Sequence, residues 1–274
     1  MLAIERYVCA PAIGDSMSST PLEVFSRRLS QRAALSEDDV AAVASLPHTV
    51  RYVHPTTYIV REGEAPKPYC GLIISGMAFR HKLTVTGARQ IVSLHLRGDM
   101  LDLQHLFLNV ADHSVQALTE LQIADIDREA LQHIALTRPA VGRALWVEGL
   151  VDASIYREWV LNVGRRDARA RIAHILCEIA VRMQAAGIID AERFQLPMTQ
   201  EQLGDATGLT SVHVNRTIKA LVADGLIEHG GRWISIRDWN GIRREGDFNP
   251  LYLHLDQVAP YFDGPLSAVF SGRD

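Results

Sequence analysis

The chain has 274 residues, 47% of them apolar and 22% charged, with a formal net charge of −4 at pH 7. The length suggests two domains, and the composition argues against a disordered or fibrous chain. The negative charge excludes the bulk basicity that marks many nucleic-acid-binding proteins. No apolar run approaches the roughly 18 residues of a membrane-spanning helix, so we expect a soluble, cytoplasmic protein that does not contact a membrane.

The cysteines are too few and too dispersed for a cysteine-based site. They stand at positions 9, 70 and 177 and form no CxxC pair. Neither a disulfide framework, a zinc knuckle nor a four-cysteine cluster can be built from them within one chain. A reducing cytoplasm fits this pattern best.

Residues 1–137 predict an irregular tail, two short helices and an all-β module. Thr20-Pro21 and Ser36 with Asp39 are helix-start signals, the second of the capping-box type. From about residue 49, short β-prone segments alternate with glycines at positions 63, 71, 76, 87 and 98. This pattern is typical of a meandering antiparallel barrel or sandwich, and residues 115–127 are expected to form its return strand.

Residues 138–164 predict one long helix. After Arg138-Pro139, apolar residues recur every three or four positions without a further proline. We expect this helix to dimerise the protein, because no second long helix is available in the chain to cover its other face; an internal core helix is the alternative. The predicted dimer contacts are Ala144, Val147, Val151, Ile155 and Trp159.

A hinge is predicted where the long helix ends. Gly164 interrupts the helical pattern, and Asp167 is expected to cap the next helix, which continues to about Ala185. We therefore place a second domain at 165–237, followed by a C-terminal extension at 238–274. Apolar residues of the extension are expected to dock on the body: Trp239, Phe248, Tyr252, Leu253 and Leu255.

Residues 199–236 predict a winged helix-turn-helix. Thr199 caps one helix and Thr210 the next, and Gly208 supplies the tight turn between them. The Gly230-Gly231 turn then joins two β-prone segments into a hairpin. A structural pair of helices is the alternative, but the second helix exposes donors suited to bases and phosphates opposite its apolar face: Ser211, His213, Asn215, Arg216 and Lys219.

Several further motifs follow one another in an order that identifies a family. They are Gly63, Glu64, Tyr69, Ile73 or Ile74 and Gly76, then Arg97-Gly98-Asp99, then RRDARARIAHIL from Arg165, then the helix-turn-helix. Residues 22–237 thereby resemble the Crp/Fnr family of bacterial transcription regulators. The resemblance implies an α+β fold with an N-terminal β-roll like a cyclic-nucleotide-binding domain, a long dimerisation helix and a C-terminal winged helix-turn-helix.

The resemblance also implies which residues contact DNA. In this family the second helix enters the major groove, which here presents Ser211, Val212, His213, Asn215 and Arg216. Val212 stands where members that bind GTGA-type or TTGA-type half-sites usually have Glu, whereas the family's helix arginine matches Arg216. Arg216 either contacts guanine or clamps a phosphate, and Thr199 is expected to contact the backbone. The candidate DNA contacts are Thr199, Thr210, Ser211, Val212, His213, Asn215, Arg216, Lys219 and Arg232.

The effector cannot be assigned by the same resemblance. Cyclic-AMP binders of the family use a Glu and an Arg at positions that Leu103 and His113 occupy here, so control by cyclic AMP is not expected. The iron–sulfur cluster of oxygen-sensing members lacks its cysteines. A different ligand, redox control through Cys70 or Cys177, and control by abundance remain open. His81, His95, His105 and His113 are possible ligands of haem or a metal ion, but no cofactor or metal is predicted.

The sequence as a whole predicts a homodimeric, sequence-specific DNA-binding transcription regulator. Its expected partners are a pseudo-palindromic double-stranded DNA operator, a second copy of the chain and RNA polymerase, with an unknown effector. The alternative is a ligand-sensing protein whose winged helix binds another protein; an enzyme has little support. Residues 165–237 carry ten basic and eight acidic residues, so the remaining chain holds a charge of −6.

Overall fold

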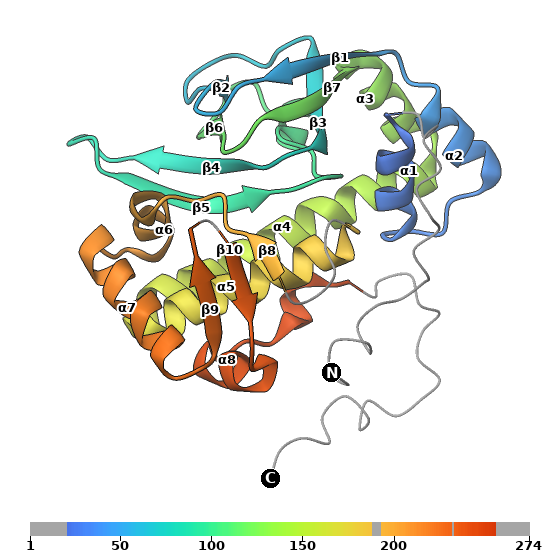
Figure 1. Ribbon diagram of the computed structural model, residues 1–274. Coiled ribbons are helices and arrows are strands. Elements are labelled where there is room, and N and C mark those ends of the chain that lie inside the picture. The colour runs from blue at the N-terminus through green and yellow to red at the C-terminus, as the bar shows by residue number, and fades with distance from the viewer. Residues whose placement is uncertain (1–20, 188–192, 232, 256–274) are drawn as a thin grey trace.

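The computed structural model describes residues 21–187, 193–231 and 233–255 (Figure 1). Two short helices come first, α1 (Glu23–Ser30) and α2 (Glu37–Ala44). The predicted capping box is confirmed at α2, where Ser36 Oγ accepts from Asp39 N at 3.1 Å and Asp39 Oδ2 accepts from Ser36 N at 3.2 Å. The predicted signal at Thr20 lies outside the described residues, and α1 begins three positions later.

Seven antiparallel strands then form the predicted β-roll from two sheets. The strands are β1 (His48–Val53), β2 (Tyr58–Val60), β3 (Tyr69–Ser75), β4 (Ala78–Leu83), β5 (Arg89–His95), β6 (Ser114–Ala117) and β7 (Leu121–Asp127). One sheet has the order β1-β7-β3 and the other β2-β6-β4-β5. The expected single return strand over 115–127 is in fact two strands, one in each sheet. Between them Gly76 approaches the chain so closely that a Cβ would lie 2.1 Å from the Glu120 carbonyl oxygen.

The apolar residues of the two sheets face each other and form the core of the β-roll. Ile73, Leu101, Val115 and Ile123 are fully buried there. A short 3₁₀ helix, η2 (Leu103–Leu106), follows the turn at Asp99. The roll packs against helices α3 (Arg128–Thr137) and α4 (Pro139–Arg165). In Figure 1, α3 lies beside β7 and α4 runs beneath the roll.

The long helix α4 is confirmed, but its predicted dimer contacts are not on its surface. Ala144, Val151, Ile155 and Trp159 are buried within the single chain, and Val147 packs against the same core. Helix α5 (Ala168–Ala185) packs along α4. It is the second long helix that the sequence analysis did not expect to find against α4. The prediction that Ala144, Val151, Ile155 and Trp159 contact a second copy is therefore wrong, whereas the half-buried Val147 remains a prediction.

The hinge segment is shorter than predicted. Helix α4 continues through Gly164 to Arg165, so this glycine does not interrupt it. Asp167 caps α5 as predicted, with its Oδ1 accepting from the backbone N–H groups of Arg169 and Ala170 at 2.9 Å each. Only Arg166 and Asp167 therefore separate the two helices.

The C-terminal part contains the predicted winged helix-turn-helix. Its elements are β8 (Arg193–Gln195), α6 (Gln200–Thr207), α7 (Ser211–Ala223), β9 (Ile227–Gly230) and β10 (Trp233–Ile236), with the sheet order β8-β10-β9. Two further elements, α8 (Trp239–Glu245) and η3 (Pro250–Leu253), belong to the extension and pack on α5 and α4. As predicted, its apolar side chains dock on the body, with Phe248 and Leu253 buried.

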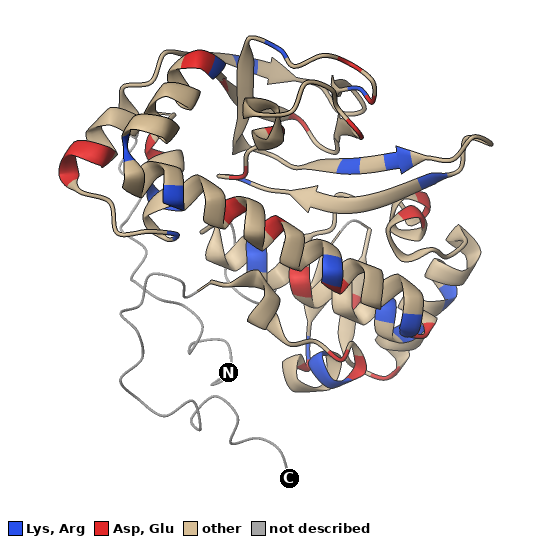
Figure 2. Cartoon of the chain, turned by 180° about the vertical axis from the view of Figure 1, so that it is seen from behind, with Lys and Arg blue, Asp and Glu red and all other residues tan. Residues whose placement is uncertain are grey.

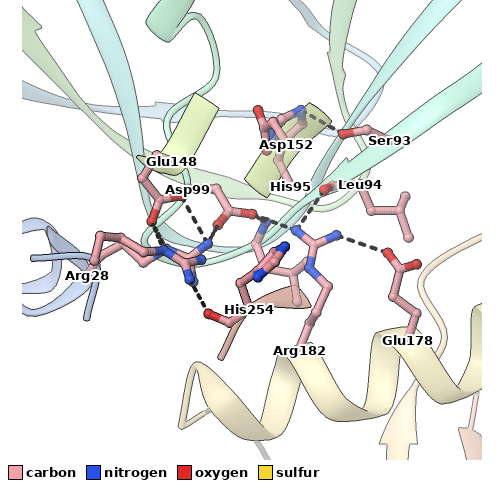
Figure 3. Close-up of polar contacts among 12 residues, drawn as sticks. Arg28, Ser93, Leu94, His95, Asp99, Glu148, Asp152, Glu178, Arg182 and His254 are labelled. Atoms are coloured by element: carbon pink, nitrogen blue, oxygen red, sulfur yellow. Dashed lines mark hydrogen bonds and ion pairs between the residues drawn. The ribbon is translucent and has the colours of Figure 1, made fainter. Parts of the chain in front are cut away.

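A buried ionic network joins the β-roll to α5 and the extension (Figure 3). Asp99 pairs with Arg28 of α1 at 3.2 Å and with Arg182 of α5 at 2.8 Å. Burial raises the pKa of Asp99, but the two guanidinium groups outweigh it and hold the pKa below its usual value. Arg32, in the turn after α1, donates to the carbonyl oxygen of His254 at 2.6 Å. These contacts connect residues that lie far apart in the chain, such as Arg182 and Asp99 at a separation of 83 positions.

Candidate nucleic-acid interface

The turn between α6 and α7 is built by glycines and caps. Gly208 ends α6 with φ +66°, and a Cβ on Gly204 would lie 2.4 Å from the Leu209 carbonyl oxygen. Any side chain at position 204 would therefore separate the two helices. The Thr199 hydroxyl accepts from Gln202 N at 3.1 Å, and Gln202 Oε1 accepts from Thr199 N at 2.9 Å. Local sequence alone accounts for this geometry.

Helix α7 has one face in the core and one face outward. Val214, Thr217, Ile218 and Leu221 are buried. Thr210 caps the helix by accepting from His213 N at 3.2 Å. The outward residues are Ser211, Val212, Arg216 and Lys219, which are exposed, with His213 and Asn215 half-buried beside them.

Five of these side chains, together with one residue of α6, line an open hollow of about 490 Å³. They are Gln200, Ser211, Val212, Asn215, Arg216 and Lys219. Sequence reasoning named all of them except Gln200. Gln200 is the first residue of α6, directly after the Thr199 cap. Its place at a helix N-terminus is the sequence feature that could have identified it as a candidate DNA contact. The hollow thus combines residues of both helices of the motif.

The two cations of this hollow are available to an external anion. Among the described residues, neither Arg216 nor Lys219 takes part in an ion pair, whereas other Arg and Lys side chains do, for example Arg182 with Asp99 and Lys82 with Glu62. Figure 2 shows Lys and Arg mixed with Asp and Glu along α4 and its neighbours, rather than one broad basic face in that view. A polyanion such as DNA would therefore be bound through a few individual contacts rather than through a strong positive electrostatic potential.

The remaining predicted contacts divide into two groups. The oxygens of Thr199 and Thr210 accept the capping bonds, and each hydroxyl keeps its own proton to donate to a phosphate. Arg232 lies outside the described residues. The wing turn itself has the expected left-handed glycine, Gly231 with φ +64°.

The interior of the β-roll holds the residues that replace the cyclic-nucleotide contacts. Leu103 is half-buried in η2. The Nε2 of His113 accepts a hydrogen bond from the Gln104 side-chain amide at 3.2 Å, and its Nδ1 donates to Asp112 Oδ1 at 2.7 Å. Burial, followed by the charge of Arg80, lowers the pKa of His113 to about 4. At neutral pH this residue is therefore uncharged and does not stand in for a guanidinium.

The other residues weighed for an effector do not gather into one site. His81 contacts Phe79 and Tyr58, whereas His95 lies 3.2 Å from Ser93. Within the described ranges, no group of three or more His, Cys, Asp or Glu side chains could hold a metal ion. Cys70 and Cys177 are both buried, and burial raises the pKa of each thiol. Neither cysteine offers the exposed thiolate that redox control would require.

No helix in the described part of the chain has both the length and the apolar content needed to cross a bilayer.

Comparisons with known proteins agree with this geometry. Residues 50–138 match the cyclic nucleotide-binding domain family, and residues 170–245 match the Crp-like helix-turn-helix domain family. The transcriptional activator protein FnrL of Cereibacter sphaeroides is 30% identical over 177 residues, which span 63% of this chain and 71% of that protein. The nitrogen fixation regulation protein FixK of Azorhizobium caulinodans is 27% identical over 178 residues, or 63% of this chain and 69% of that protein.

The fold is also found in a solved structure. FixK2 from Bradyrhizobium japonicum superimposes with a TM-score of 0.67 at 26% identity, covering 73% of this chain and 98% of that one. In this chain the cyclic nucleotide-binding match precedes the helix-turn-helix match, in the order that the β-roll and the recognition helix have in the structure.

Proposed function

The chain belongs to the Crp/Fnr family of DNA-binding transcription regulators, and from this premise we propose that it acts as a cytoplasmic homodimer on a pseudo-palindromic operator. Half-sites about one helical turn apart would match two recognition helices related by a two-fold axis. The family consists of regulators and not of enzymes. RNA polymerase is a further proposed partner, since a regulator acts on transcription.

One observation carries the proposed binding mode. Arg216 and Lys219 stand on the outward face of α7, exposed, beside the half-buried amide of Asn215. A guanidinium can donate two parallel hydrogen bonds to guanine O6 and N7, while an ammonium suits a phosphate. We assign base contact to Arg216 and backbone contact to Lys219, with Thr199, Thr210, Ser211, His213 and Arg232 as supporting contacts.

The surface proposed for the dimer lies on the outward face of α4. Trp146 and Val160 are each 72% exposed, and Leu150 and Leu161 are exposed as well. Large apolar side chains on the exposed side of a long helix favour burial against a second copy. The face opposite to the predicted one is thus the candidate, because four of the five predicted residues are already buried within one chain.

The proposed division of labour follows the modules. Residues 1–137 form the sensor-type part, 138–164 the dimerisation helix, 165–237 the DNA-binding part and 238–274 the extension, with a hinge at Arg166 and Asp167, between α4 and α5. We propose that cyclic AMP is not the effector, because uncharged His113 cannot grip a cyclic phosphate as a guanidinium would.

The base-contact assignment is tested by selection from a random DNA pool followed by Arg216→Ala. We expect the protein to select a two-fold symmetric sequence, and the variant to lose roughly 10- to 100-fold in affinity together with preference at one guanine in each half-site. Affinity lost with base preference unchanged would show that Arg216 only clamps a phosphate. Failure to select any sequence would overturn the proposal and favour a protein-binding winged helix.

A further inference from the structure

We propose that Val212 recognises the C5-methyl group of a thymine in each half-site; this inference rests on the proposed operator binding. Val212 is the second residue of α7 and is 77% exposed. It does not share the buried face of that helix, where Val214, Ile218 and Leu221 lie. An isolated apolar side chain thus stands outward at the tip of the recognition helix.

The position of Val212 places it against the same partner as the two cations. Residues 212, 216 and 219 are spaced by four and three positions, so their side chains lie on one helical face. All three line the same hollow. Whatever approaches Arg216 and Lys219 also meets the two methyl groups of Val212.

The distance along the helix predicts which base pair Val212 meets. One helical turn, about 5.4 Å, separates it from Arg216, and base pairs stack about 3.4 Å apart. Val212 therefore faces a base pair one or two steps from the guanine proposed for Arg216.

The chemistry of valine then selects the base. Valine has neither donor nor acceptor, so it cannot satisfy the polar edges of guanine, cytosine or adenine and would leave them unpartnered. Thymine alone among the four bases presents an apolar group in the major groove. The neighbouring polar side chains, Ser211 and Asn215, can form hydrogen bonds with the polar groups of the same base pair or of the next one.

The experiment uses the full chain and the operator obtained by selection. Binding is measured by fluorescence anisotropy on duplexes that carry thymine, deoxyuridine, cytosine or 5-methylcytosine at the position one or two pairs from the Arg216 guanine. Deoxyuridine removes only the methyl group. We expect it to weaken binding roughly three- to tenfold per substituted half-site, and methylation of the cytosine duplex to recover part of the affinity.

Two variants tie this effect to one side chain. Val212→Ala is expected to bind thymine and deoxyuridine duplexes equally. Val222→Ala removes the same two methyl groups from an exposed position at the other end of α7 and should keep the full discrimination. Thermal unfolding confirms that both variants fold.

The possible results separate the inference from its premise. If a sequence is selected but the protein does not distinguish thymine from deoxyuridine there, or Val212→Ala distinguishes them as well as the unaltered protein does, methyl recognition by Val212 is overturned while operator binding stands. If no sequence is selected, both fall. Arg216→Ala should retain the methyl effect on whatever affinity remains.

Discussion

Charged side chains are exposed on α7 but buried and paired at the junction of the β-roll and α5. On α7, Arg216 and Lys219 are exposed and, among the described residues, without an ion pair. At the junction of the β-roll and α5, Arg28, Asp99 and Arg182 are largely buried and paired with one another (Figure 3). Charges with partners inside the chain hold its parts together, whereas charges left without them are available to DNA.

The junction continues into the C-terminal extension. Tyr252 donates to Glu178 at 2.7 Å, and the Trp159 indole donates to the same carboxylate at 3.0 Å. His174, fully buried, donates from Nδ1 to the Gly246 carbonyl at 3.1 Å. A Cβ on Gly246 would lie 2.6 Å from His174 N, so this contact requires glycine. The extension is therefore part of the body that carries α7.

The largest expected effect is on stability, from Arg182→Ala. Removing this guanidinium leaves Asp99 and Glu178 buried with fewer partners, which should lower the free energy of unfolding by about 3–5 kcal/mol. Urea denaturation measures it. Arg237→Ala breaks the exposed pair with Glu228 and is the matched control, expected to cost less than about 1 kcal/mol. Equal losses in the two variants would contradict the contrast between buried and exposed charges.

The next effect is a dependence of stability on pH at His174. Burial, followed by the charge of Arg166, lowers the pKa of His174 to about 4. Because a histidine in the unfolded chain has a pKa near 6.5, the unfolded state binds more protons between these values. Stability is therefore full above about pH 6.5 and falls as the pH drops to about 4, by roughly 3 kcal/mol from this residue.

That contribution is isolated with His174→Asn, whose amide can still donate to Gly246. Urea denaturation at several pH values between 4 and 7 should show a shallower slope for the variant than for the unaltered chain. Identical slopes would mean that His174 does not contribute.

The smallest expected effect concerns the exposed side of the comparison. Lys219→Ala should weaken DNA binding uniformly across sequences, by about 1 kcal/mol at moderate salt, and reduce the slope of log affinity against log salt by about one per contact removed. Binding titrations at several salt concentrations measure it. Arg27→Ala, an exposed charge on α1, serves as control and should leave the slope unchanged. A change in base preference for Lys219→Ala would instead assign it to a base.

The helix-turn-helix could be predicted because its signals are local. Thr199, Gly208 and Thr210 act within about one helical turn of themselves, and the alternation of buried and outward residues on α7 follows the helical period. The β-roll was predictable in kind from its spaced glycines. Its division of residues 115–127 between two sheets was not, because strand pairing depends on distant partners.

The outward face of α4 could not be predicted, and the reason is physical. This helix is apolar nearly all round, so its sequence period does not distinguish Trp159, which packs on α5, from Val160, which is exposed. Only the position of α5 decides between them. The same holds for Gln200, which joins the recognition surface because α6 and α7 come together there.

The sequence by itself determined the modules, their order and the caps of the recognition helix, since each depends on residue type at short range. Tertiary structure alone decided which arginines form ion pairs within the chain and which face outward. Arg182 meets Asp99 across 83 positions, a distance over which no sequence period acts. The net charge of −4 therefore says little about DNA binding, whereas the placement of a few unpaired cations says much.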